Sequence, residues 1–286
     1  ATPSAVTEMA RERLESGISD AAPNGDFWSG CYTPATLDAI LRLRASLRDI
    51  EGGVADALRA IVLGALHGPR TKITPSYFSN QMPRTFASKP AYSVRYWARN
   101  QLTPPEVDVI DVIARRAERY FAAAPAASGG TIITGDSRTA EPLGDPFDIV
   151  ITSPPYFGMR TYVQDQWLRN WFLGGPDAPD YIQPSQIAAG TSAQFAGELG
   201  KVWANISRFC VPGARMIIRF GAIQSRPCDP IEIIRSSLAS SGSGWSIDEI
   251  RPAGAAHAGK RQAEQMGQRS RSGAAVDESD FICVLQ

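Results

Sequence analysis

A run of apolar and β-branched residues that begins at Asp148 ends in four residues with distinctive chemistry: Ser153, Pro154, Pro155 and Tyr156. Ser153 and Pro154 each precede a proline and are therefore restricted to extended backbone. Neither proline has an N–H group, so this corner offers carbonyl oxygens and a serine hydroxyl with few competing donors. Tyr156 adds a flat aromatic face beside those acceptors. The four residues are therefore candidates for holding a planar group that carries an amine.

The exocyclic amine of a nucleobase has the required shape and hydrogens. Its lone pair is delocalised into the ring, which makes it a poor nucleophile. Two acceptors that hold its hydrogens favour a more tetrahedral nitrogen and free the lone pair. The base must first leave the duplex, and an aromatic ring offsets its lost stacking by about 1–3 kcal/mol. The corner also follows a candidate parallel strand, at the end where open α/β sheets bind ligands.

The stretch from Asp148 to Tyr156 resembles the catalytic motif of amino-group DNA methyltransferases, which is Asp, Asn or Ser followed by Pro-Pro and an aromatic residue. TIITGDSRT, which starts at Thr131, is similar to the preceding strand of that family and its Gly-Asp turn. VPGARMIIRFG, which starts at Val211, is similar to the next strand with its Pro-Gly entry. A final strand pair also matches. The resemblance covers roughly the second half of the chain and implies S-adenosylmethionine as the methyl donor.

The resemblance implies a role for each motif residue. Ser153 and the carbonyl of Pro154 hold the amine, Pro155 stiffens the corner, and Tyr156 stacks on the flipped base. The cofactor contacts are expected from Gly135, Asp136 and Ser153, with Asp136 contacting the adenosine part.

The identity of the target base stays open between two amines. A serine in the first motif position is associated chiefly with cytosine N4, which we therefore favour over adenine N6. Methyltransferases of RNA bases or protein amides form a second alternative, but their motif usually begins with Asn. A non-catalytic DNA-binding subunit is a third, although such a subunit has no need of this donor-poor corner.

The part of the family fold that binds the cofactor is missing from the sequence. It is normally a strand, a glycine-rich turn and a helix, and the family sheet has seven strands. We find candidates for only five, and none of three glycine-containing stretches fits: NGDFWSGCYTP, SGSGW and IIRFGAIQS. Either a second polypeptide supplies the cofactor half or the chain is a fragment. We expect a heteromeric enzyme, because an incomplete sheet leaves an open edge that favours pairing.

The element pattern predicts a helical region over residues 1–125 and an α/β domain over residues 126–286. Helices are expected at 33–50, 52–69, 91–100 and 104–124, and thereafter strands alternate with helices. The expected strands lie in TIIT, FDIVITS, GARMIIRFG, GWSIDEIRPA and FICVL. The predicted fold class is thus α/β: a partial Rossmann-like sheet of an S-adenosylmethionine-dependent methyltransferase, lacking its first two strands, after an N-terminal helical region.

Charge is balanced overall, with 29 basic and 29 acidic residues, but it is unevenly distributed. Residues 65–105 contain no Asp or Glu, and basic residues also gather between 251 and 271. Such local patches suit a polyanion such as double-stranded DNA. The candidate phosphate contacts are Lys72, Arg84, Lys89, Arg95, Lys260 and Arg261. The aromatic rings interleaved with the first four are more typical of core residues.

The remaining features exclude several classes of protein. The chain has two histidines and four widely spaced cysteines, which predict neither a metal site nor a disulfide framework. No apolar run is long enough to cross a bilayer, and the first residues lack the apolar block of a secretory signal. We therefore expect no membrane partner and a cytoplasmic location.

Overall fold

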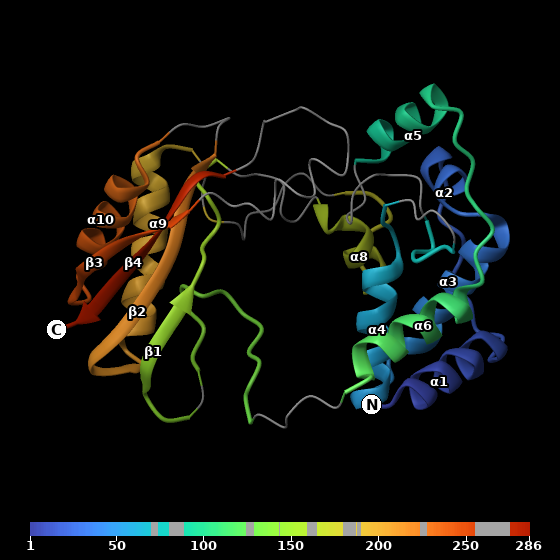
Figure 1. Ribbon diagram of the computed structural model, residues 1–286, viewed down its shortest axis with the longest axis horizontal. Helices are drawn as coiled ribbons and strands as arrows, with labels where there is room; N and C mark the ends of the chain where they lie inside the picture. Colours follow the sequence, from blue (N-terminus) through green and yellow to red (C-terminus); the bar gives the residue numbers. More distant parts are fainter. Residues whose placement is uncertain are drawn as a thin grey trace. The chain divides into compact units, whose positions relative to one another are not determined.

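The computed structural model describes residues 1–69, 74–79, 89–123, 129–142, 144–158, 165–179, 187, 190–223, 228–254 and 275–286. The chain divides into two compact units. The first comprises residues 1–128 and 161–182, and the second comprises residues 129–160 and 183–286. Figure 1 shows helices in the first unit and a sheet with helices in the second.

The secondary-structure elements described in the first unit are all helices. Its helices are α1 (Pro3–Glu15), α2 (Asp26–Cys31), α3 (Pro34–Leu47), α4 (Gly53–Ala65), α5 (Pro90–Arg99), α6 (Val109–Phe121) and α8 (Trp167–Phe172). The expected start of α3 is confirmed, because the Thr33 hydroxyl accepts a hydrogen bond from the Thr36 N–H at 3.3 Å. The helix at 104–124 starts later than predicted. Asp108 caps α6, so the prolines at 104 and 105 lie outside it.

Helix α8 packs in the helical unit, although the sequence analysis placed it with the α/β domain. The ring of Trp171 lies 4.4 Å from that of Trp28, and the Arg44 guanidinium lies 5.1 Å from the Trp171 ring. Arg44 also donates to the Trp171 carbonyl at 2.8 Å. Trp167, Trp171 and Phe172 are buried. These aromatic side chains join the helical core because large rings contribute most to its buried apolar area.

The second unit is an α/β structure with a mixed four-stranded sheet of order β1-β2-β4-β3. The strands are β1 (Phe147–Thr152), β2 (Cys210–Ile223), β3 (Trp245–Gly254) and β4 (Ala275–Leu285). β1 is parallel to β2, whereas β4 is antiparallel to both β2 and β3. The helices α9 (Ser192–Ser207) and α10 (Pro230–Ser241) cover one face (Figure 1). Alternate β2 residues point into that core: Ala214, Met216, Ile218 and Phe220.

The prediction of a strand in TIIT is wrong. Residues 131–134 are described without strand structure, and the side chain of Ile132 is 97% exposed. A strand needs a hydrogen-bonded neighbour as well as apolar residues. Of the described strands, only β2 pairs with β1, and none pairs with TIIT. Four of the five expected strands are therefore present.

Candidate functional site

The Ser-Pro-Pro-Tyr corner directly follows β1, where the strand ends at Thr152. Because β1 and β2 are parallel, their carboxyl ends lie at the same edge of the sheet. Ser153 is exposed, and the two prolines and Tyr156 are partly buried. The four predicted residues therefore lie together, with the serine hydroxyl accessible to a ligand.

The ring of Tyr156 is held by contacts at two places. It forms a T-shaped contact with the ring of Phe220 on β2, with the ring centroids 5.7 Å apart and the planes at 71°. Its hydroxyl donates a hydrogen bond to the carboxylate of Glu278 on β4. The tyrosine is therefore fixed to two strands other than the one it follows. Sequence analysis missed Glu278, because nothing local in the sequence links residues 156 and 278.

Phe157 anchors the corner to the core. It is 7% exposed, and its ring lies 5.6 Å from Phe195 in the first turn of α9. Phe195 in turn stacks on Phe220 at 6.2 Å. Gly158, at φ 79°, then turns the chain in a conformation that favours glycine. The pair Phe157-Gly158 after the motif was the available signal for this anchor.

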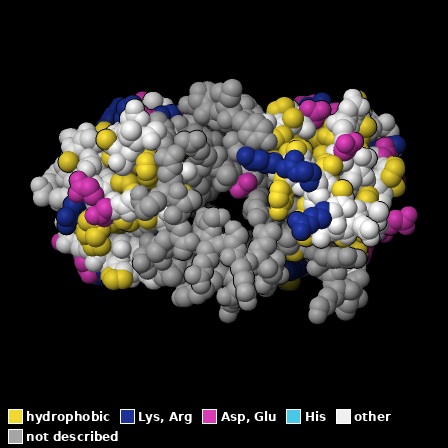
Figure 2. Space-filling model, turned by 90° about the horizontal axis from the view of Figure 1, so that it is seen from above, with side chains coloured by type: hydrophobic (Ala, Val, Ile, Leu, Met, Phe, Trp, Pro, Cys, Tyr) yellow, Lys and Arg dark blue, Asp and Glu magenta, His cyan; other side chains and the backbone are white. Residues whose placement is uncertain are grey.

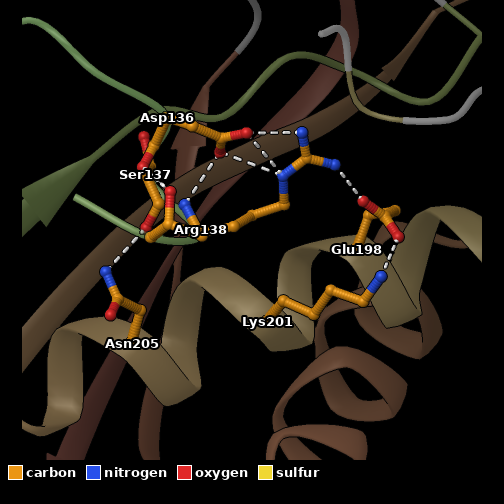
Figure 3. Close-up of polar contacts among 7 residues, drawn as sticks. Asp136, Ser137, Arg138, Glu198, Lys201 and Asn205 are labelled. Carbon is orange, nitrogen blue, oxygen red and sulfur yellow. Dashed lines mark hydrogen bonds and ion pairs between the residues drawn. The ribbon is translucent and has the colours of Figure 1, made fainter. Parts of the chain in front are cut away.

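No strand precedes the Gly-Asp turn in the described structure. Ion pairs of Asp136 and Arg138 hold it in place (Figure 3). Asp136 accepts hydrogen bonds from Arg138 at 2.9 Å from Nε and 2.6 Å from Nη2. The other guanidinium nitrogen of Arg138 pairs with Glu198 of α9, which also accepts from Lys201 at 2.5 Å. The hydrogen bonds from Arg138 lower the pKa of Asp136 to about 2. The carboxylate is thus ionised at neutral pH.

Asn205 of α9 holds the backbone of the same turn. Its side-chain amide donates to the carbonyls of Ser137 at 3.1 Å and Ala140 at 2.8 Å. The Asn205 side chain therefore supplies hydrogen bonds to backbone carbonyls of this turn, as a neighbouring strand would to a strand. Two separate positions on α9, Glu198 and Asn205, fix where Asp136 lies.

Asp136 fits only part of its expected cofactor role. A carboxylate offers about four acceptor sites, and the backbone and side chain of Arg138 make four contacts to it. The Asp136 side chain is nevertheless 41% exposed. Gly135 is exposed beside it.

The glycines considered for the cofactor turn have structural roles. A Cβ at Gly30 of α2 would lie 2.8 Å from the Trp97 ring, so this glycine allows two helices to approach. Gly242 ends α10 in the left-handed conformation, and a Cβ at Gly244 would lie 3.2 Å from the carbonyl oxygen of Gln286. Gly221 is an internal residue of β2. Residues 224 and 225 of the third stretch lie outside the described residues.

The predicted DNA contacts are only partly described. Lys89 and Arg95 are exposed on the helical unit, at the start and in the middle of α5. Tyr92 and Tyr96 of the same helix stack at 6.4 Å, whereas Trp97 is buried. Lys72, Arg84, Lys260 and Arg261 lie outside the described residues. On the face drawn in Figure 2, basic, acidic and apolar side chains are interspersed.

The chain matches no known protein-family model and shows no significant similarity to a curated protein. Among the helices that the structure describes, none combines the length and apolar character needed to cross a membrane. The functional argument therefore rests on the chemistry and geometry of the corner itself.

Proposed function

We propose that this chain carries the amine-binding part of a DNA methyltransferase that uses S-adenosylmethionine and methylates an exocyclic base amine, with cytosine N4 as the favoured target. The observation that carries the proposal is the donor-poor corner at the carboxyl end of β1, with the exposed Ser153 beside the fixed ring of Tyr156. A packing turn needs neither an accessible hydroxyl nor a ring secured to two further strands.

The corner residues have separate tasks in this proposal. The Ser153 hydroxyl and the Pro154 carbonyl accept the two amine hydrogens, which concentrates the lone pair on nitrogen. Tyr156 stacks on the extruded base and replaces part of its lost stacking. S-Adenosylmethionine, when bound, supplies an electrophilic methyl group. Transfer would break the methyl–sulfur bond of the donor, whose electron pair would stay on sulfur, and form the new N–C bond. The nitrogen would then carry one proton too many. Ser153, which is exposed, can pass that proton to water.

Asp136 and Gly135 are the residues of this chain that would contact the adenosine part of the cofactor. An ionised carboxylate is a suitable acceptor for an adenine amine, and the pKa of Asp136, lowered to about 2 by hydrogen bonds from Arg138, keeps it ionised at working pH. The partial Rossmann-like sheet belongs to the same proposal. Two parallel strands with α9 and α10 on one face are compatible with half of such a fold.

The proposal includes a second polypeptide that supplies a strand beside β1 and a glycine-rich cofactor turn. β1 is an end strand of the sheet, and its Ile149 and Ile151 side chains are 60% and 76% exposed. Ile132, in the preceding stretch, is 97% exposed. Parallel strands are normally buried on both faces. A neighbouring strand with its own helix would cover these isoleucines and bring a cofactor turn to the edge that carries Ser153.

Replacing the native gene in its host tests the function together with whatever partner the cell supplies. Genomic DNA is digested, and methylated nucleosides are measured by mass spectrometry for the wild type, Ser153→Ala and Tyr156→Ala. Exposed positions on the helical unit provide the controls, Ser4→Ala and Tyr120→Ala. We expect N4-methylcytosine to fall at least about 100-fold in both corner variants and to stay unchanged in both controls.

Unchanged methylation in both corner variants would remove the catalytic assignment. Loss of N6-methyladenine instead would retain the mechanism and reassign the base. A methylated base that disappears from RNA alone would reassign the substrate. Full S-adenosylmethionine binding by the purified chain, measured by calorimetry, would contradict the need for a second polypeptide.

A further inference from the structure

The contact between Tyr156 and Glu278 joins the corner to a strand that lies far along the sequence. The hydroxyl of Tyr156 donates to Glu278, while its ring forms a T-shaped contact with Phe220. The phenol oxygen lies on the long axis of the ring, so the carboxylate fixes where that axis ends. Phe220 limits rotation of the ring plane about the axis. Together the two contacts define one orientation for the ring.

The strand register explains why Glu278 can reach Tyr156. Its Cα partners are Gly221 on β2 and Gly254 on β3, so both cross-strand neighbours of Glu278 lack a side chain. Directly opposed side chains normally contact each other across a sheet. Here both of those neighbours are glycines, and the phenol of Tyr156 contacts the carboxylate.

The next residue on the same face of β4 behaves differently. Asp280 has Arg219 and Arg251 as its Cα partners, and Arg219 donates two hydrogen bonds to it at 2.8 Å. These bonds, chiefly, raise the pKa of Arg219, and Glu278 makes a smaller contribution. The charge of Glu278 is therefore partly balanced by Arg219, while Asp280 takes the guanidinium hydrogens.

We propose that Glu278 is a positioning residue for base stacking: it holds Tyr156 in the orientation that receives the flipped base. This inference rests on the proposed function. A ring already fixed loses little rotamer freedom when the base arrives, so more of the stacking energy contributes to binding. A hydroxyl bound to a carboxylate is also one of the stronger hydrogen bonds in proteins. Glu278 acts only through Tyr156 and does not contact the base.

A double-mutant cycle on the native complex tests this role. Tyr156→Phe removes only the hydroxyl, Glu278→Ala removes the acceptor, and Glu278→Gln retains an acceptor oxygen. Glu249→Ala, an exposed carboxylate paired with Arg251 on β3, is the control. Steady-state methylation gives kcat and KM for DNA. Fluorescence of 2-aminopurine at the target position reports stacking of the flipped base directly.

We expect Tyr156→Phe and Glu278→Ala each to lower kcat/KM by about tenfold, with stronger 2-aminopurine fluorescence because stacking is lost. The double variant should be no worse than either single variant, because both remove the same hydrogen bond. Glu278→Gln should recover most of the activity, and Glu249→Ala should match the wild type. Multiplied effects in the double variant, about 100-fold, would overturn the inference.

Urea unfolding of the purified chain provides a readout that is independent of methylation. The same non-additivity should appear in the unfolding midpoints if the contact exists. If the effects on the unfolding midpoint were additive while the wild type still methylated DNA, the positioning role of Glu278 would be refuted. The proposed function would be unaffected. Coupled midpoints in a chain whose native complex methylates nothing would refute the function, and the positioning role with it.

Discussion

The two outer edges of the sheet that the structure describes differ in how they are protected. The β3 edge carries Pro252, shifts of register on either side of Glu249–Pro252, and the exposed charges of Asp248 and Arg251. Proline, irregular register and charge are the usual devices that prevent an edge strand from pairing with another chain. β1 has the sequence FDIVIT, in which Asp148 is the only charged residue. β3 therefore carries features that end a sheet, whereas the described β1 lacks proline and has one charged residue.

The sheet face opposite the helices carries charged side chains on β2 and β4 and apolar side chains on β1. On β2 and β4 it carries the ion pair of Arg219 and Asp280, which suits a solvent-exposed surface. On β1 it carries Ile149 and Ile151, aligned with Arg215 and Ile217 of β2. Solvent is therefore the expected neighbour at one side of the face, and protein the expected neighbour at the other. This difference supports the second polypeptide in the proposed function.

Charges placed on β1 should have the largest effect. In Ile149→Lys/Ile151→Lys, we expect methylation in native cells to fall by about 100-fold or more, because an added strand would bury two unpaired ammonium groups. The purified chain should keep its free energy of unfolding within about 0.5 kcal/mol, because both side chains are exposed. Nucleoside mass spectrometry and urea unfolding measure the two effects.

Asp248→Lys is the control for that variant, since it places a lysine on the opposite edge strand. It should leave both methylation and stability unchanged. Normal methylation by the β1 variant would show that the exposed isoleucines are not an assembly surface.

Removing the protection of β3 should have an intermediate effect. Arg251→Val/Pro252→Val restores a backbone N–H and removes a charge at the β3 edge. We expect self-association, with the weight-average mass rising by about twofold at high protein concentration. Sedimentation equilibrium gives the mass, and Arg119→Val on exposed α6 surface is the control. A monomeric variant would mean that Pro252 and Arg251 do not protect this edge.

Lowering the pH should have the smallest effect. It acts on stability through the ion pair of Arg219 and Asp280. Hydrogen bonds from Arg219 lower the pKa of Asp280 below its ordinary value of 3.8. The pair therefore stabilises the fold above pH 4, and that contribution is lost as the pH falls through the lowered pKa. Both side chains are partly exposed, so the ion pair should contribute little to the free energy of unfolding. Added salt should reduce that contribution further. Urea unfolding at pH 7 and pH 3 should differ less in Asp280→Asn than in the wild type; an equal difference would contradict this.

Much of the local structure could be predicted because its causes are local. Thr191 and Gln194 form a capping box at the start of α9, and Asp229 caps α10. These residues define helix starts through hydrogen bonds that span three residues or fewer. The corner at Ser153–Tyr156 was found for the same reason, because stiffness, missing donors and an aromatic face are properties of adjacent residues.

Other features could not be read from nearby residues. Ile132 and Ile133 satisfy the pattern of a strand, but their backbone has no described neighbour to pair with. α8 satisfies the pattern of a helix, but contacts with distant residues such as Trp28 and Arg44 decide which unit it joins. The Arg138 and Asn205 contacts to the Gly-Asp turn depend on where α9 packs.

The sequence by itself determined the residue types and local stiffness of the corner: two prolines, a serine and a tyrosine after an apolar strand. Tertiary structure alone decided how that tyrosine is held. Strand register brings Glu278 between two glycines and next to a residue 122 positions away in sequence. Strand order also leaves β1 at the end of the described sheet, with Ile149 and Ile151 exposed. Both results follow from pairing between distant segments, and such pairing leaves no periodicity in the residues on either side.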